Sequence, residues 1–201
     1  MLEPTEWVLE AATSEERDDV SVIQIEAISL DAVVTGTSLL PEGGSTILDL
    51  RELRWGLEEE TIKLADAFIS SGRLGRWEGR RAGSKTYEAN EKVVTDALPM
   101  VLVGRHTAGV GEILAAALQG AGAVVVGQTS VGFAPYMSLV QDGDVAIWMP
   151  VGQWLRPDDE KIDGKGIDPD EVVERIDPEA EGDPVLDRAL EILHQDLEKA
   201  A

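Results

Sequence analysis

The pattern of apolar and polar positions along the chain predicts a series of short strands. β-Branched and apolar residues dominate several runs of four to seven residues, which suits buried or half-buried strands. These runs are Val20–Glu26, Thr46–Leu50, Met100–Val103, Gly122–Gly127 and Asp144–Met149. Turn-forming residues separate some of the runs, as at Pro41–Ser45 and at Asp142-Gly143.

A second period, close to 3.6 residues, predicts helices between these strands. Apolar residues recur at helical spacing over Leu57–Ile69, and Gly72 is expected to stop that helix. Glu112–Gln119 is rich in alanine, and Pro184–Lys199 carries one apolar stripe. The stripe consists of Leu186, Leu190, Leu193 and Leu197. Arg73–Asn90 is polar and predicts a loop with short β pieces. Strands that alternate with helices favour a layered α/β domain.

Length and composition fit one domain with an acidic lead-in. A chain of 201 residues is long enough for a full hydrophobic core. Residues 1–19 are acidic and carry no motif, and we expect a helical or frayed segment there. We therefore expect the core domain to occupy residues 20–201.

Charge and residue content exclude several classes of function. A net charge of -22 repels phosphate backbones and anionic lipid, so we expect no nucleic-acid partner and no membrane-surface role. With no cysteine and only two histidines, a thiolate or multi-histidine metal site is not expected, and neither is a cofactor. No apolar run is long enough to span a bilayer and no export signal is visible, which makes the cytoplasm the default compartment.

Four motifs occur in the order found in one enzyme family. Ile47–Arg51 (ILDLR) precedes a helix that ends with Leu64–Phe68 (LADAF). Val101–Leu118 (VLVGRHTAGVGEILAAAL) is followed by Val125–Gly132 (VVGQTSVG) and by Gly164–Asp170 (GKGIDPD). Together they resemble the core domain of the C-terminal processing, or tail-specific, serine peptidases. The resemblance implies a ClpP/crotonase-like ββα layered core, and no segment here resembles the PDZ domain that often accompanies it.

The family's chemistry needs residues that this chain lacks at the matching positions. In these serine-type endopeptidases a serine attacks the peptide bond and a lysine accepts its proton. By resemblance the serine position is Gly109 and the lysine position is Phe133. No lysine lies between Val125 and Val140, so a one-residue shift would not supply the base. Glu112, which helps to orient the lysine in some members, is present and is expected to cap or charge a helix N-terminus.

The oxyanion turn is altered as well. The family's Gly-Gly pair, whose backbone N–H stabilises the oxyanion, is replaced by Trp55 and Gly56. One interpretation is that the rings of Trp55 and Phe133 fill the vacated catalytic pocket. The alternative is that both rings lie on the surface.

Other residues with chemical potential are expected to be structural. Thr107 and His106 are the nearest hydroxyl and imidazole to Gly109, but adjacent residues rarely face each other and no orienting acid is evident. Ser130 is expected to be a hydroxyl at a strand end. His194 is predicted to face solvent, Asp168 and Asp170 to mark a turn, and Trp148 and Trp154 to lie in the core or at an interface.

The sequence thus favours a catalytically inactive pseudopeptidase that binds peptide or protein, or serves as a structural subunit beside an active relative in an oligomer. An extended peptide is expected to add as a strand along a four-residue segment. That segment is Val131, Gly132, Phe133 and Ala134. The alternative is an active serine-type hydrolase of the same family that uses non-standard residues.

Overall fold

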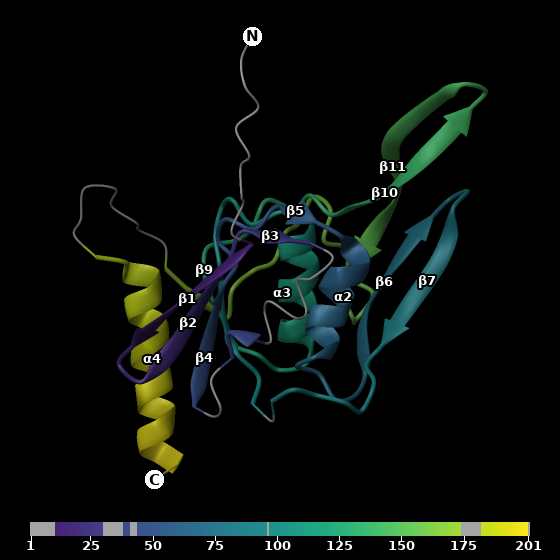
Figure 1. Cartoon of the computed structure of the whole chain (residues 1–201). Coiled ribbons are helices and arrows are strands. Elements are labelled where there is room, and N and C mark those ends of the chain that lie inside the picture. Colours follow the sequence, from purple (N-terminus) through teal and green to yellow (C-terminus); the bar gives the residue numbers. More distant parts are fainter. Residues whose placement is uncertain (1–10, 30–37, 41–43, 96, 174–181, 201) are drawn as a thin grey trace.

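The protein folds around one central sheet with a smaller sheet beside it (Figure 1). The structure is a computed structural model, which describes residues 11–29, 38–40, 44–95, 97–173 and 182–200. The central sheet has the strand order β1-β2-β4-β8-β9-β12. Its strands are β1 (Ala12–Arg17), β2 (Val20–Ile25), β4 (Ser45–Asp49), β8 (Met100–Val103), β9 (Val125–Gly127) and β12 (Glu171–Val172). The five strands from β2 to β12 in this sheet order, which are β2, β4, β8, β9 and β12, run parallel, and β1 is an antiparallel edge strand.

Helices cover both faces of the central sheet, which makes three layers (Figure 1). One face packs against α2 (Glu58–Asp66) and α3 (Val110–Gly120), and the other against α4 (Pro184–Ala200). Alternation along β8 explains this division, since Val101 and Val103 face the first core and Met100 and Leu102 face the second. The predicted layered α/β core, with its near-continuous apolar strands, is confirmed.

The smaller sheet has the strand order β10-β11-β6-β7. Its strands are β6 (Arg73–Gly79), β7 (Gly83–Glu88), β10 (Pro135–Asp142) and β11 (Val145–Leu155). Aromatic rings join its strands: Trp77 stacks on Tyr136 with ring centroids 3.9 Å apart, and Trp154 is buried beside them. Trp77 and Trp154 also belong to the first core, which connects this sheet to the body. β3 (Ala27–Ile28) and β5 (Trp55–Gly56) form a separate parallel pair.

Three expectations about local structure need correction. Ala12–Arg17 is strand β1 and not a helix, because the turn residues Asp18 and Asp19, both at positive φ, fold it back onto β2. Arg73–Asn90 is mostly the β6–β7 hairpin, whose polar residues face solvent on a peripheral sheet. The helix predicted over Leu57–Ile69 ends at Asp66, well before Gly72.

The remaining strand and helix predictions agree with the structure to within a few residues, except that β11 continues to Leu155. Of the two tryptophans left open, Trp154 is a core residue at 1% exposure, whereas Trp148 is 63% exposed. Residues 1–10 of the lead-in and Pro41–Gly43 of the predicted turn lie outside the described residues. None of the helices in the described part of the chain has the length and apolar character needed to cross a membrane.

The apolar stripe on α4 gives a matched test of the second core. Leu190 is 8% exposed and packs against the sheet, whereas Leu197, two turns later, is 53% exposed. We expect Leu190→Ala to lower the free energy of unfolding by about 2 to 4 kcal/mol, because it leaves a cavity. Leu197→Ala should change it by less than about 0.5 kcal/mol. Chemical denaturation measures both, and equal effects would contradict the packing of α4 described above.

Candidate functional site

Gly109, which the resemblance predicts to stand at the nucleophile position, lies at the N-terminus of α3. It is the residue before the first helical turn and has φ 55° and ψ −117°, a conformation that favours glycine. A Cβ placed there would lie 2.9 Å from the carbonyl oxygen of Arg54 and 4.0 Å from that of Phe133. The backbones on either side therefore leave no room for a side chain unless they move.

The N–H of Gly109 is directed into the protein. It donates to the carbonyl of Phe133 at 2.8 Å and to Oε2 of Glu112 at 3.2 Å. This N–H therefore has two acceptors within the protein, and its bonds hold the start of α3 against the segment that carries Phe133.

Glu112 is the centre of the polar contacts at this position. Its side chain is fully buried and accepts four hydrogen bonds, which matches the acceptor capacity of a carboxylate. The donors are Ser130 Oγ at 2.5 Å, the N–H of Gly132 at 2.5 Å, the N–H of Phe133 at 2.9 Å and the N–H of Gly109 at 3.2 Å. The predicted capping contact is present, and Glu112 also fixes the segment from Ser130 to Phe133 against α3.

The hydroxyl group of Ser130 both donates and accepts a hydrogen bond within the protein. Its Oγ donates to Glu112 and accepts the N–H of Ile167 at 2.7 Å, so both of its roles are used. The carbonyl of Gly132 likewise accepts the N–H of Gly164 at 2.8 Å. The two motifs Val125–Gly132 and Gly164–Asp170 therefore lie side by side, and they support the loop before β10.

Trp55 and Phe133 do not fill a pocket, which corrects one interpretation drawn from the sequence. Trp55 is 78% exposed and Phe133 is 57% exposed. Side chains exposed to this extent do not occupy a buried pocket. Both rings lie outside, with the exposed side chains of Leu57 and Val131.

The residues that match the oxyanion turn belong to a strand pair. Trp55 and Gly56 form β5, which pairs in parallel with Ala27 and Ile28 of β3. A Cβ on Gly56 would lie 2.7 Å from Cβ of Ile28, so glycine is required by this close approach. The β3 partner therefore sets the conformation of the segment.

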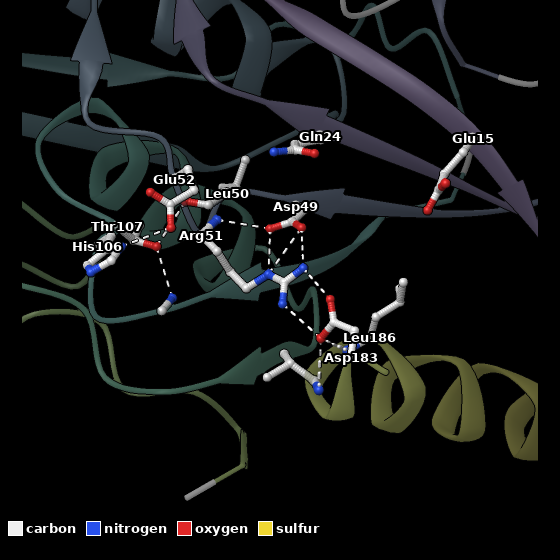
Figure 2. Close-up of polar contacts among 12 residues, drawn as sticks. Glu15, Gln24, Asp49, Leu50, Arg51, Glu52, His106, Thr107, Asp183 and Leu186 are labelled. Carbon is white, nitrogen blue, oxygen red and sulfur yellow. Dashed lines mark hydrogen bonds and ion pairs between the residues drawn. The ribbon is translucent and has the colours of Figure 1, made fainter. Parts of the chain in front are cut away.

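Thr107 and His106 are not brought together. Thr107 is fully buried, and its Oγ1 donates to the carbonyl of Leu50 and accepts the N–H of Gly104, both at 2.9 Å. The ring of His106 is exposed, and its Nδ1 lies 2.9 Å from Oε1 of Glu52 (Figure 2). Burial acts to raise the pKa of Glu52, but contacts with His106 and Arg54 hold it below its ordinary value. His106 and Glu52 therefore form a contact at the surface.

Arg51 has a structural role that the sequence analysis did not assign. Figure 2 shows its guanidinium between Asp49 and Asp183, with contacts of 2.6 to 3.1 Å. Asp183 also caps α4 by accepting the N–H groups of Val185 and Leu186. Burial alone would lower the pKa of Arg51, but bonds to Asp49 and Asp183 raise it above its ordinary value. The ILDLR motif therefore joins the end of β4 to the last helix.

The acidic and histidine residues in the described part of the chain are engaged in other contacts. Among the described residues, no group of three or more His, Asp and Glu side chains is arranged to hold a metal ion. Asp168 accepts the hydroxyl of Thr129, and Asp170 accepts the N–H of Val125. His194 lies on α4 and approaches the carbonyl of Asp18 at 3.4 Å.

The segment expected to receive a peptide strand has most of its backbone groups occupied. The N–H groups of Val131, Gly132 and Phe133 and the carbonyls of Gly132, Phe133 and Ala134 all bond within the chain. That is six of the eight backbone polar groups, and an added strand would need them free. Addition of a peptide along Val131–Ala134 is therefore not what this geometry favours.

One carboxyl group with a raised pKa, that of Glu58, lies away from Gly109. Burial raises the pKa of Glu58, the first residue of α2, to about 6. Contacts with the N–H of Met137 and the indole of Trp154 oppose the shift. The indole Nε1 of Trp154 is buried and makes no hydrogen bond with the described residues, so its contact with Glu58 is weak. Glu58 stands where α2 meets the smaller sheet, and it has no nucleophile beside it.

Comparison with known proteins is consistent with the resemblance. The family model "Peptidase family S41" matches residues 39–173. The carboxyl-terminal-processing protease of Synechocystis sp. is 32% identical over 160 residues, which cover 78% of this chain and 38% of that protein. The carboxy-terminal processing protease CtpA of Bacillus subtilis is 35% identical over 126 residues, which cover 61% of this chain and 27% of the relative. The chain thus spans less than half the length of these curated relatives.

Solved structures share the fold. The photosystem II D1 C-terminal processing protease superposes with a TM-score of 0.71 at 21% identity, over 77% of this chain and 42% of the other. A lipoprotein from Streptococcus agalactiae gives a TM-score of 0.74 at 16% identity, over 92% of this chain and 70% of the other.

Glu112 should be a large contributor to stability. Glu112→Ala leaves four donors without their acceptor in the interior, and we expect it to lower the free energy of unfolding by at least about 3 kcal/mol. Glu52→Ala removes only a half-exposed surface pair and should cost less than about 1 kcal/mol. Denaturant titration compares the two. A loss for Glu112→Ala as small as that for Glu52→Ala would contradict the buried network.

Glu58 should make stability depend on pH. Because its folded pKa of about 6 lies above the ordinary value of a glutamate, its contribution to stability is greatest below about pH 4.5 and falls as pH rises through 6. The effect of Glu58→Gln on the free energy of unfolding, measured against the parent, should therefore be more favourable at neutral pH than in acid by about 1 to 2 kcal/mol.

The neighbouring Glu59 is the control, since its pKa is lowered. Burial acts to raise that pKa, but bonds from Tyr87 and Lys85 outweigh it. The effect of Glu59→Gln on the free energy of unfolding should follow the opposite trend with pH. Unfolding curves recorded from pH 4 to pH 8 test both variants, and a Glu58→Gln effect that does not vary with pH would refute the assignment.

Proposed function

This chain belongs to peptidase family S41, and we propose that it is a catalytically inactive member retained to bind peptide or protein. The observation that carries the proposal is the environment of Gly109. The position has no side chain, a Cβ there would meet the carbonyl of Arg54, and its N–H is bonded inward to Phe133 and Glu112. A serine nucleophile would need a side chain at this position and room for it beside the carbonyl of Arg54.

The position of the base supports the same proposal. A phenyl ring at Phe133 accepts no proton, and the sequence offers no lysine from Val125 to Val140. Glu112 is retained but is saturated by four donors, so its carboxylate has a structural task. Neither Gly109 nor Phe133 has a side chain that could act as nucleophile or base, and Glu112 is engaged in structural hydrogen bonds. Together these features support a loss of hydrolysis over a rearranged dyad.

The surface around Gly109 suits the binding of an apolar segment. Four exposed apolar side chains flank it: Trp55 at 78%, Phe133 at 57%, Val131 at 52% and Leu57 at 44%. Exposed apolar surface of this kind, with two aromatic rings, is typical of binding sites. We propose that an unfolded or extended peptide contacts these side chains, and that its backbone does not pair with Val131–Ala134. A structural subunit beside an active relative would use the same surface.

The proposal is tested by a peptidase assay and a binding assay on the same preparation. Unfolded protein substrates should not be cleaved. A peptide with apolar side chains should quench or shift tryptophan fluorescence, and the affinity should fall about tenfold or more in Trp55→Ala. Because Trp55 is exposed, that variant should keep the stability of the parent within about 0.5 kcal/mol. Leu197→Ala, on the far helix, is the matched control.

Cleavage that disappears in Thr107→Ala or His106→Ala would overturn the proposal in favour of an active hydrolase. The contacts of Thr107 with Leu50 and Gly104 argue against that outcome, since its hydroxyl is already committed. Gly109→Ser combined with Phe133→Lys should remain inactive, because a side chain at position 109 is strained and the local N–H is engaged.

A further inference from the structure

An open depression lies on the face of the smaller sheet that points away from the core. Glu78 of β6 is paired with Ser84 of β7 on one side and with Gln153 of β11 on the other, so these three side chains share a face. Trp77, the preceding residue of β6, belongs to the first core, and Glu78 therefore points outward. The depression on this outward face has a volume of about 680 Å³. Its hairpin, β6–β7, lies on the side of the molecule away from α4 (Figure 1).

Three glycines keep side chains out of this depression. Gly79, Gly83 and Gly152 all line it. A Cβ on Gly79 would meet the carbonyl oxygen of Val151, and a Cβ on Gly152 would meet that of Glu78. The close approach of β6 and β11 therefore requires glycine at both positions, and it leaves space above the strands.

One pair of charges in the lining is already satisfied within the protein. Nη2 of Arg76 donates to Oε2 of Glu78 at 2.9 Å, and Nε2 of Gln153 donates to Oε1 of the same carboxylate at 3.1 Å. Nε of Arg76 also donates to Asp159 at 2.5 Å. These groups hold one another in place and have little capacity left for a ligand.

Arg80 and Asp163 line the same depression, and their charges are not satisfied. Both side chains are exposed, and within the described part of the chain neither makes an ion pair or hydrogen bond, with the other or with any third group. The hydroxyl of Ser84, between them in the lining set, also makes no hydrogen bond to the described residues. A free guanidinium, a free carboxylate and a free hydroxyl therefore face one space.

The charges of the lining select the ligand. Its charged residues are Arg76, Arg80, Glu78 and Asp163, which sum to no net charge. A purely acidic ligand would be repelled by Asp163 and a purely basic one by Arg80, whereas a ligand with both charges is complementary to the pair. A depression of about 680 Å³ is of the size that holds a drug-sized molecule, so a single amino acid would leave most of it empty.

We propose that this depression binds a peptide segment of a partner protein in which an acidic and a basic side chain lie close together. The acidic side chain pairs with Arg80 and accepts the hydroxyl of Ser84, and the basic side chain pairs with Asp163. The lining shares no residue with the apolar surface around Gly109, so this is a second site and does not rest on the proposed function.

The site is tested by fluorescence anisotropy of the full chain with a labelled octapeptide of alternating glutamate and lysine. Arg80→Gln and Asp163→Asn should each weaken its binding about threefold or more, since each removes one ion pair. Arg81→Gln, next to Arg80 in the same turn but outside the lining, is the matched control for the cation. Asp144→Asn, in the turn between β10 and β11, is the control for the acid. Neither control should change the affinity.

A second peptide, of alternating glutamate and glutamine, separates a mixed-charge site from a site for acidic ligands. Asp163→Asn should strengthen the binding of this peptide, because it removes a repulsion, while it weakens that of the glutamate–lysine peptide. The effect of one substitution therefore changes sign between the two peptides. A general effect of the net charge of -22 would appear equally in Asp144→Asn.

Amide chemical shifts place the bound peptide on the molecule. Addition of the glutamate–lysine peptide should shift the amide signals of Arg80, Ser84 and Gln153 in the parent chain. Near-ultraviolet circular dichroism of the stacked Trp77 and Tyr136 shows whether each variant is folded. Because the substituted side chains are exposed, all four variants should fold as the parent does.

The proposal is overturned if the glutamate–lysine peptide does not bind at millimolar concentration, or if Arg81→Gln weakens it as much as Arg80→Gln. It is also overturned if Asp163→Asn fails to weaken the binding of that peptide, which would leave at most a site for acidic ligands. Shifts confined to amides outside the depression would have the same meaning. None of these measurements depends on whether the chain hydrolyses peptides or binds apolar ones.

Discussion

The buried carboxylate of Glu112 is the interaction on which the region around Gly109 depends. It stands in the first turn of α3 and gathers four donors from two separate segments of the chain. A buried acceptor of this kind stabilises the fold only when all of its partners are in place. The loop before β10, the start of α3 and the position of Phe133 are therefore set together by one side chain.

The same network fixes the backbone from which Phe133 projects. Glu112 accepts the N–H groups of Gly109 and Phe133, and the carbonyl of Phe133 accepts the N–H of Gly109. On this fixed backbone the side chain of Phe133 is 57% exposed, and that of Trp55 is 78% exposed. The binding function that we propose rests on this exposed apolar surface.

Much of the fold could be predicted from the sequence, because strands such as Met100–Val103 are buried on both faces and read as continuous apolar runs. Ala12–Arg17 could not, since an exposed edge strand depends on its pairing partner and not on its own residues. At the site, motif spacing pointed to Gly109, Phe133 and Glu112, and their correspondence to catalytic positions stays a prediction. The sequence could not decide whether the two rings are exposed, or give the role of Arg51, because these depend on contacts between distant segments such as Arg51 and Asp183.

The alternation along β8 has a consequence for how the molecule comes apart. Met100 and Leu102 lie in one core and Val101 and Val103 in the other, so four consecutive residues belong to both layers at once. Loss of either layer would expose the side chains of β8 that this layer covers, and the strand that supports the other layer would lose its packing on one face. The two cores therefore form a single cooperative unit, and partial melting of one helical layer should not leave the other intact.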